Sequence, residues 1–313
     1  MPATKHSNEV ETGMAAQKPS AIAEALPGAD AIRLLEFVQV GPDRFCNRFS
    51  EIARNDHLFG GQVLAQALAA ASRTVEGRRC HSMHAYFLRA GSARRSIAFD
   101  VERTRDGGRF STRRVVASQG DRAIFHMECS FHDAESGLAH QVATLPDVPP
   151  PESLADIAAM PVEGEMDGLG NIVVAARLFP LLQVRLVDHE RMRAPDPSAH
   201  RQFWVRVPSA AGCDDPAIQQ ALLAYLSDFL FSGAALLPHP IQYRSPRLSV
   251  ASLDHAMWFH HPPHCDDWLL YDCDGLQAGE GRGLTRGLLL DRAGRLIASV
   301  VQEALFRPKA ALE

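Results

Sequence analysis

Two stretches of the chain are apolar on almost every side, which is the pattern of a buried helix. The first runs from Gln62 to Ala71 and follows the pair Gly60-Gly61, and the second runs from Ile218 to about Leu230. A helix without a polar face has to be covered on all sides. The hydrophobic pattern therefore predicts one core helix in each half of the chain.

Each apolar helix is followed by four runs with the alternation that is typical of β-strands. These runs cover residues 80–90, 97–105, 109–119 and 122–132 in the first half, and 248–260, 267–274, 282–291 and 295–306 in the second. A shorter strand precedes each helix, at 45–49 and 202–207. We therefore expect an α+β protein of two tandem β-α-β-β-β-β units, each a curved antiparallel sheet wrapped around its central helix.

The sequences of the two halves are also partly repeated. The run Gly108–Arg113 returns as Gly281–Arg286, and His84-Ala85 returns as His255-Ala256 at nearly the same spacing. Identities that keep one order and one spacing indicate a duplicated domain. The repeat predicts that Arg109 and Arg282 occupy equivalent places, and it allows a single copy to keep the chemistry.

Composition narrows the class of protein. The chain has 313 residues, of which 46% are hydrophobic and 22% charged, as in soluble globular proteins, and its formal net charge of −5 favours no nucleic-acid partner. No apolar run approaches the roughly 18 residues of a membrane span. Six scattered cysteines without a C-x-x-C pair indicate a reduced compartment, and Ala311-Leu312-Glu313 is not a peroxisomal signal. We expect a cytoplasmic protein.

Several runs of the chain form a characteristic set, namely Phe59–Val63 with Gln66-Ala67, His81–Gly91, Tyr225–Asp228, Ser252–His260 and Val301–Glu303. A run such as Asp254-His255-x-Met257-Trp258-Phe259-His260 rarely occurs by chance. Together these runs resemble the type II acyl-CoA thioesterases, a family with a double hotdog fold, in which each sheet wraps around a helix. The resemblance extends from about residue 30 to 307 in the family's order.

The resemblance and the patterning together predict four regions. They are a mobile N-terminal tail at 1–30, an N-terminal hotdog at 31–140, a linker with some local helix at 141–200, and a C-terminal hotdog at 201–313 that carries the catalytic residues. The proline-rich stretch Pro146–Pro151 supports the linker, because such composition is typical of connecting segments.

The resemblance also implies an activity and the residues that perform it. In this family an Asp, a Thr or Ser, and a Gln of the second hotdog hold and activate a water molecule, and the matching positions here are Asp228, Ser252 and Gln302. Many bacterial members have Thr at the place of Ser252, so the hydroxyl is kept. The implied reaction hydrolyses acyl-CoA to a free fatty acid and coenzyme A, without metal, organic cofactor or covalent intermediate.

Without the resemblance, the same three residues have ordinary structural explanations. Asp228 fits an exposed carboxylate near a helix end, Ser252 a small core residue, and Gln302 a buried amide satisfied by the sheet. Ser252 is not a nucleophile of the common kind, because the chain has no G-x-S-x-G motif.

Three further residues are candidates for substrate contact. Gly60 and Gly61 precede a buried helix, where backbone N–H groups at the positive end of the helix dipole are able to polarise a thioester carbonyl; simple close packing is the alternative. His84 lies in one of the runs that carry the resemblance.

Two other groups of polar residues, one of histidines and one of arginines, are weaker candidates for a binding site. The run His255 to Asp267 contains four histidines, but Pro262-Pro263 interrupts it and no zinc-type helical pair is present, so we expect no metal. Arginines are frequent on the strands of the first half and are able to bind the phosphates of coenzyme A, although most fit solvated strand faces. They stand at 94, 95, 103, 105, 109, 113 and 114.

Two other functions remain as alternatives. A hotdog enoyl-CoA hydratase wants an Asp-x-Asn-Pro-x-His context, and no such run is present. A non-catalytic acyl-CoA-binding protein needs no water-activating residues. Apolar residues on the backs of the sheets favour a homo-oligomer, a dimer or a tetramer.

Overall fold

The computed structural model describes residues 22–52, 56–162, 168–241, 245 and 247–309. Most of the predicted tail, residues 1–21, lies outside the described residues. The short strand β1 (Glu24–Ala25) pairs in parallel with β4 (Phe49–Ser50) in a two-stranded sheet. Among the described residues no helix has the length and apolar character to cross a membrane.

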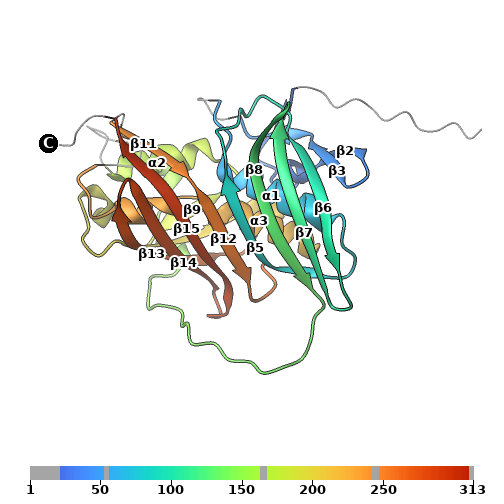
Figure 1. Ribbon diagram of the computed structural model, residues 1–313. Coiled ribbons are helices and arrows are strands. Elements are labelled where there is room, and N and C mark those ends of the chain that lie inside the picture. The colour runs from blue at the N-terminus through green and yellow to red at the C-terminus, as the bar shows by residue number, and fades with distance from the viewer. Residues whose placement is uncertain (1–21, 53–55, 163–167, 242–244, 246, 310–313) are drawn as a thin grey trace, which may run out of the picture.

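One continuous 13-stranded sheet contains the strands of both halves (Figure 1). Its order is β2-β3-β6-β7-β8-β5-β12-β15-β14-β13-β10-β9, with β11 also paired to β15, and all neighbours are antiparallel. The two halves join where β5 pairs with β12. The predicted double hotdog, with its two sheets side by side, is therefore confirmed.

The remaining strands of the first half are β2 (Phe37–Gly41), β3 (Arg44–Asn47), β5 (Arg79–Phe87), β6 (Ala98–Asp106), β7 (Phe110–Gln119) and β8 (Arg122–His132). The strands that follow are β9 (Gln183–Leu186), β10 (His200–Arg206), β11 (Leu248–Ser252), β12 (Asp254–Phe259), β13 (Leu269–Gly279), β14 (Arg282–Asp291) and β15 (Leu296–Pro308). The α-helices are α1 (Gly60–Ser72), α2 (Gly168–Leu178) and α3 (Pro216–Ser227). Short 3-10 helices are η1 (Arg33–Leu35), η2 (Pro151–Ser153), η3 (Ile157–Ala159), η4 (Glu190–Arg193), η5 (Pro208–Ala210) and η6 (Ser232–Leu236).

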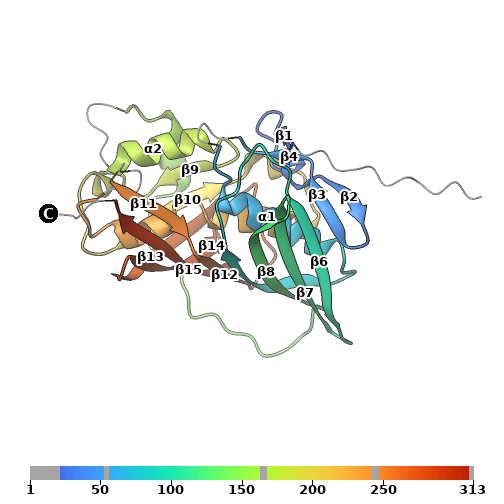
Figure 2. The same ribbon diagram turned by 45° about the horizontal axis from the view of Figure 1, so that its top comes forward.

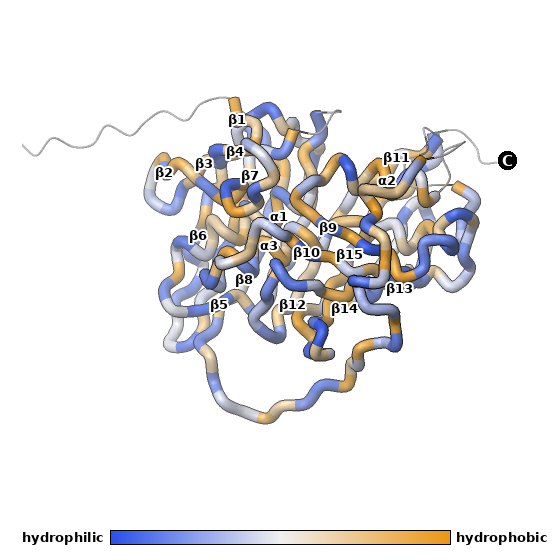
Figure 3. The backbone as a smooth tube through the Cα atoms, turned by 180° about the vertical axis from the view of Figure 1, so that it is seen from behind, coloured by the Kyte–Doolittle hydropathy of each residue, from blue (hydrophilic) through white to orange (hydrophobic). Residues whose placement is uncertain are grey.

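The two predicted core helices, α1 and α3, lie together on the inner face of the sheet (Figures 1 and 2). Seen from behind, they occupy the centre of the molecule (Figure 3). Nearly every residue of both is buried, as their apolar composition requires. Asp215 caps α3 by accepting hydrogen bonds from the N–H groups of Ala217 and Ile218, and Pro216 occupies the first turn.

The start of α1 approaches the end of α3 closely. A Cβ atom on Gly61 would lie 2.3 Å from the carbonyl oxygen of Tyr225, and one on Gly60 would lie 2.6 Å from Oδ2 of Asp228. Only glycine fits at either position without a shift of its neighbours. The pair Gly60-Gly61 therefore allows the N-terminus of one core helix to meet the C-terminus of the other.

The predicted strand 248–260 is interrupted at Leu253. β11 pairs with the last residues of β15, whereas β12 pairs with the middle of β15 and with β5. The sequence pattern predicted one strand because polar and apolar residues keep alternating through Ser252, Leu253 and Asp254. The interruption is important because Ser252 stands directly before it.

The segment 141–200 contains more regular structure than a linker needs. It forms α2 and the edge strand β9, which pairs with β10 and extends the sheet. The preceding connection runs along the outside of the molecule (Figure 1).

The sequence repeat is displaced by one residue from the structural repeat. His84 is exposed whereas His255 is buried, so the two face opposite sides of the sheet. When the alignment of the two halves is shifted by one residue, Tyr86-Phe87 correspond to Trp258-Phe259, and the corresponding side chains point to the same faces of the sheet. The first residue of β14, Arg282, then corresponds to the first residue of β7, which is Phe110.

The predicted equivalence of Arg109 and Arg282 is therefore wrong. The physical reason lies in the β6–β7 turn, where the N–H of Gly107 donates to the carbonyl oxygen of Phe110, just as Gly279 pairs with Arg282 across the corresponding turn of the second half. Two residues separate the paired positions in both turns, so Arg109 lies within the turn at the place of Gly281, whereas Arg282 begins a strand.

Candidate functional site

A cavity of ≈ 640 Å³ opens beside the meeting point of α1 and α3. Its walls come from the start of α1, the end of β5, α2, the segment 228–241 and β11. Much of the lining is apolar, including Leu58, Val63, Phe87, Ile172 and Phe179. Both halves of the chain and the segment between them therefore build one cavity, as expected for a site between duplicated domains.

Asp228 lines this cavity as the C-cap residue, directly after the last residue of α3. Its carboxylate accepts a hydrogen bond from the N–H of Gly61, at the positive end of the α1 dipole. Burial raises the pKa of the Asp228 carboxyl, against the opposing effects of His255, Gln302, Gly61 and Ser252. A carboxylate in this environment is a stronger proton acceptor than one in water.

Ser252 and Gln302 lie beside Asp228. Nε2 of Gln302 donates to Oγ of Ser252 at 2.9 Å, and both side chains also hydrogen-bond Asp228. Ser252 lines the cavity at the end of β11, whereas Gln302 is fully buried behind it on β15. The structure thus brings together the three residues that the resemblance implied, which we name the candidate trio.

The two glycines are also at this place, but they differ in their contacts. Gly60 lines the cavity. The N–H of Gly61 is directed to the Asp228 carboxylate. An N–H that holds a carboxylate is not free for a substrate oxygen, so Gly60 is the better of the two candidates for the oxyanion.

His84 is not brought to the candidate trio. It is exposed on β5, and its ring packs edge-on against Trp258 with a centroid distance of 5.1 Å. The inward-facing neighbours on β5 are Met83 and Ala85. Since successive side chains of a strand alternate between faces, His84 lies on the side of the sheet opposite the helices.

The histidine cluster separates in the structure. His255 is completely buried, whereas His260 is exposed and contacts Oγ of Ser299 at 2.9 Å. In the described part of the chain, no group of three or more His, Cys, Asp or Glu side chains has a metal-binding arrangement.

His255 is the residue whose position sequence reasoning missed. Its Nδ1 lies 2.5 Å from Oε1 of Gln302, and its Nε2 lies 3.0 Å from Oγ of Ser227. Burial lowers the pKa of the His255 imidazole, and the nearby Asp228 carboxylate opposes this effect. An inward-facing histidine on an otherwise apolar strand face was the available signal.

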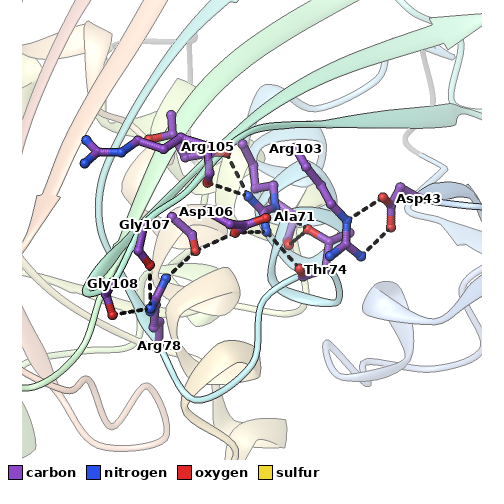
Figure 4. A network of polar contacts seen from close by, with 12 residues as sticks. Asp43, Ala71, Thr74, Arg78, Arg103, Arg105, Asp106, Gly107 and Gly108 are labelled. Atoms are coloured by element: carbon purple, nitrogen blue, oxygen red, sulfur yellow. Dashed lines mark hydrogen bonds and ion pairs between the residues drawn. The ribbon is translucent and has the colours of Figure 1, made fainter.

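None of the seven candidate arginines between residues 94 and 114 lines the cavity. Arg113 is almost fully buried and donates to Thr74 and Asp106, and Arg103 binds Asp43. Figure 4 shows Arg103 and Asp106 within this network, which also includes Arg78 and the turn at Gly107 and Gly108. These contacts are structural. The arginines at the cavity are Arg89, Arg193 and Arg201.

Two family models match the chain. The "Acyl-CoA thioesterase" model matches residues 181–305, and the "Acyl-CoA thioesterase N-terminal domain" model matches residues 50–132. The first contains the candidate trio and the second contains α1.

Relatives from animals and bacteria match most of the chain. Acyl-coenzyme A thioesterase 8 of Rattus norvegicus is 38% identical over 286 residues, covering 88% of both chains. Acyl-CoA thioesterase 2 of Haemophilus influenzae is 37% identical, covering 80% of this chain and 87% of its own.

Solved structures agree with this relationship. The acyl-CoA thioesterase II TesB2 from Mycobacterium marinum is 38% identical with a TM-score of 0.73, and the match covers 90% of this chain and 99% of the other. A hotdog-fold protein from Alicyclobacillus acidocaldarius, 16% identical with a TM-score of 0.70, shows the same fold over 90% and 98% of the two chains. The fold is thus that of the hotdog proteins. More particularly, the chain belongs to the acyl-CoA thioesterase family.

Proposed function

We propose that this protein hydrolyses fatty acyl-CoA to a free fatty acid and coenzyme A by direct attack of a water molecule. The observation that carries this proposal is the candidate trio, because Asp228 and Ser252 line a largely apolar cavity and Gln302 hydrogen-bonds both of them from behind its wall. An apolar cavity suits an acyl chain, and a buried carboxylate beside two hydrogen-bonding side chains suits the activation of water.

In this mechanism Asp228 accepts a proton from the water as its oxygen attacks the thioester carbonyl. Ser252 and Gln302 position the water, and the N–H of Gly60 at the start of α1 stabilises the oxyanion. The tetrahedral intermediate collapses by breaking the C–S bond, and the proton held by Asp228 passes to the departing thiolate. Arg89 and Arg193 at the cavity are suited to the phosphate groups of coenzyme A.

Release of coenzyme A from a panel of acyl-CoA chain lengths, followed with a thiol reagent, tests the proposal. We expect turnover with at least one fatty acyl-CoA. Absence of coenzyme A release across the whole panel would contradict the proposed function.

We further propose that the protein acts in the cytoplasm as a homo-oligomer. Tyr86 and Trp258 are 54% and 37% exposed on the outer face of the central strands β5 and β12, which supports association through that face. Light scattering of the purified protein measures the oligomeric state.

Removal of the Ser252 hydroxyl is expected to weaken catalysis without abolishing it. A hydrogen bond to a charged group contributes about 1.5–3 kcal/mol, so Ser252→Ala and Gln302→Ala should each lower kcat by about 10- to 100-fold. Ser252→Thr restores an Oγ and should lose less than Ser252→Ala. Steady-state kinetics measure this difference; equal losses for Ala and Thr would mean that the hydroxyl does not contribute.

Turnover should survive treatment with a metal chelator, because the proposed activation of water uses side chains alone. The measurement is the rate of coenzyme A release before and after incubation with EDTA. Loss of activity that zinc restores would contradict the mechanism.

A further inference from the structure

His255 forms a hydrogen-bonded chain behind the candidate trio. Its Nδ1 contacts Oε1 of Gln302 at 2.5 Å, and Gln302 in turn donates to Ser252 at 2.9 Å. On its other side Nε2 lies 3.0 Å from Oγ of Ser227, the last residue of α3. His255 and Gln302 are both fully buried. The chain therefore connects the end of α3 to the cavity through the imidazole.

Counting protons fixes the direction of the hydrogen bond between Gln302 and His255. The Gln302 amide nitrogen has two protons, and its partners are Ser252 and the Asp228 carboxylate. The amide oxygen then faces Nδ1 of His255, so Nδ1 has to carry a proton and donate it. Nε2 lies 3.0 Å from Oγ of Ser227, whose hydroxyl donates to the carbonyl oxygen of Ala224 at 2.9 Å.

The opposite orientation of the amide is unfavourable. It would turn the oxygen of Gln302 towards the Asp228 carboxylate, and two acceptors at hydrogen-bonding distance repel each other. In the observed orientation, an N–H group faces the carboxylate instead. A donor at the position of Nδ1 selects this orientation, because it pairs only with the amide oxygen.

In the first half of the chain, which lacks the candidate trio, apolar residues occupy the places of His255 and Gln302. The one-residue correction matches Met83 to His255 and Arg113 to Thr285. Cys129 takes the place of Gln302, because Cys129 pairs with Arg113 as Gln302 pairs with Thr285, and Met83 pairs with Cys129 across the ladder. The C-cap residue of α1 is Arg73, whereas the C-cap residue of α3 is Asp228. The polar chain is therefore not required by the fold, since an apolar pair fills the equivalent place.

We propose that His255 is a positioning residue for the reaction: its Nδ1–H holds the Gln302 amide so that the amide N–H groups face Asp228 and Ser252. This inference rests on the proposed function. His255 does not line the cavity and acts only through Gln302. It keeps Gln302 in the orientation in which its N–H groups hold Asp228 and Ser252, the two members of the candidate trio that line the cavity, beside one water.

Three substitutions of His255 distinguish positioning from packing. His255→Met places at this position the residue that the first half carries, and it should lower kcat by about 10- to 100-fold with KM changed less than about 2-fold. His255→Asn puts an amide N–H near the place of Nδ1 and should recover activity to within about 5-fold of the parent. His255→Gln puts its amide near Nε2, so it leaves Gln302 without a donor and should resemble His255→Met.

Thermal unfolding of the same variants is measured in parallel. A packing role predicts that activity follows the melting temperature. A positioning role predicts that Asn and Gln differ in kcat at similar melting temperatures. Equal kcat values for His255→Asn and His255→Gln would overturn the inference.

A double-mutant cycle tests the route of the effect. In a Gln302→Cys background, His255→Met should cost less than about 3-fold, because the amide that His255 orients is gone. The double variant recreates the Met83–Cys129 pair, so it is expected to fold. A loss in that background as large as in the parent would show that His255 does not act through Gln302.

Failure of this inference and failure of the proposed function give different results. A fully active Asp228→Asn enzyme would refute the mechanism under the proposed function. Full activity in His255→Met, with none in Asp228→Asn, would refute only this inference.

Discussion

Replacing Asp228 by asparagine is expected to lower kcat by about 10² to 10⁴ with little change in KM. Asparagine keeps the shape and the hydrogen bonds of the side chain but does not accept the proton of the water. General-base catalysis contributes an effect of this size, roughly 3–5 kcal/mol of barrier. KM should change little because the acyl chain and coenzyme A contact other parts of the cavity. Steady-state kinetics with the best acyl-CoA of the panel measure both quantities.

The matched control for this experiment is Asp121→Asn. Asp121 is exposed in the turn between β7 and β8, far in sequence from the candidate trio. Asp106 is a poorer control, because its carboxylate accepts hydrogen bonds from Arg113 and Ser111 and its replacement would disturb that network. The control should keep parental kinetics. An Asp228→Asn enzyme with parental kcat would exclude Asp228 as the base while leaving the fold unaffected.

The losses at the candidate trio should not add. Asp228, Ser252 and Gln302 are proposed to act on one water, and groups that act as a unit give combined losses smaller than the sum of the separate ones. This behaviour separates a shared site from three independent contributions to stability.

The helices and strands were predictable from the sequence because their signals are local. The apolar composition of α1 and α3 requires burial on all sides, and alternation marks the strands after them. The break at Leu253 was not predictable, because it depends on where β11 and β12 find partners along β15. The position of Ser252 beside Gln302 depends on that break, so it required the three-dimensional structure.

The site was predictable only in part, because the sequence repeat and the structural repeat differ by one residue along the strand. The sequence repeat matched His84 to His255, but a displacement of one residue moves a strand side chain to the other face. His255 therefore faces Gln302 inside the sheet, whereas His84 packs on Trp258 outside it. The contribution of α2 to the cavity was also hidden, since no local pattern shows which face of the fold a connecting segment covers.

The second large effect is expected from Gly61→Ala, which should lower the free energy of unfolding by about 2–3 kcal/mol. Alanine is favoured over glycine in a helix interior by about 1 kcal/mol, which taken alone predicts stabilisation. The added Cβ would lie 2.3 Å from the carbonyl oxygen of Tyr225 and 2.5 Å from the Phe59 ring. A backbone oxygen in the core is not free to move aside, and overpacking costs about 1–3 kcal/mol or more. The clash should therefore outweigh the helix propensity.

Thermal and denaturant unfolding measure this change, and a fall in melting temperature of about 5–10 °C is expected. Gly108→Ala is the matched control, because a Cβ at Gly108 has no atom within 4 Å and its φ lies outside the left-handed region. Gly61→Ala should also lower kcat, since separating α1 from α3 moves the Gly61 N–H away from the Asp228 carboxylate. If Gly61→Ala were as stable as the parent, the close contact between the two core helices would not exist in solution. Asp228 would then lack the N–H group and the helix N-terminus that hold its charge beside the water.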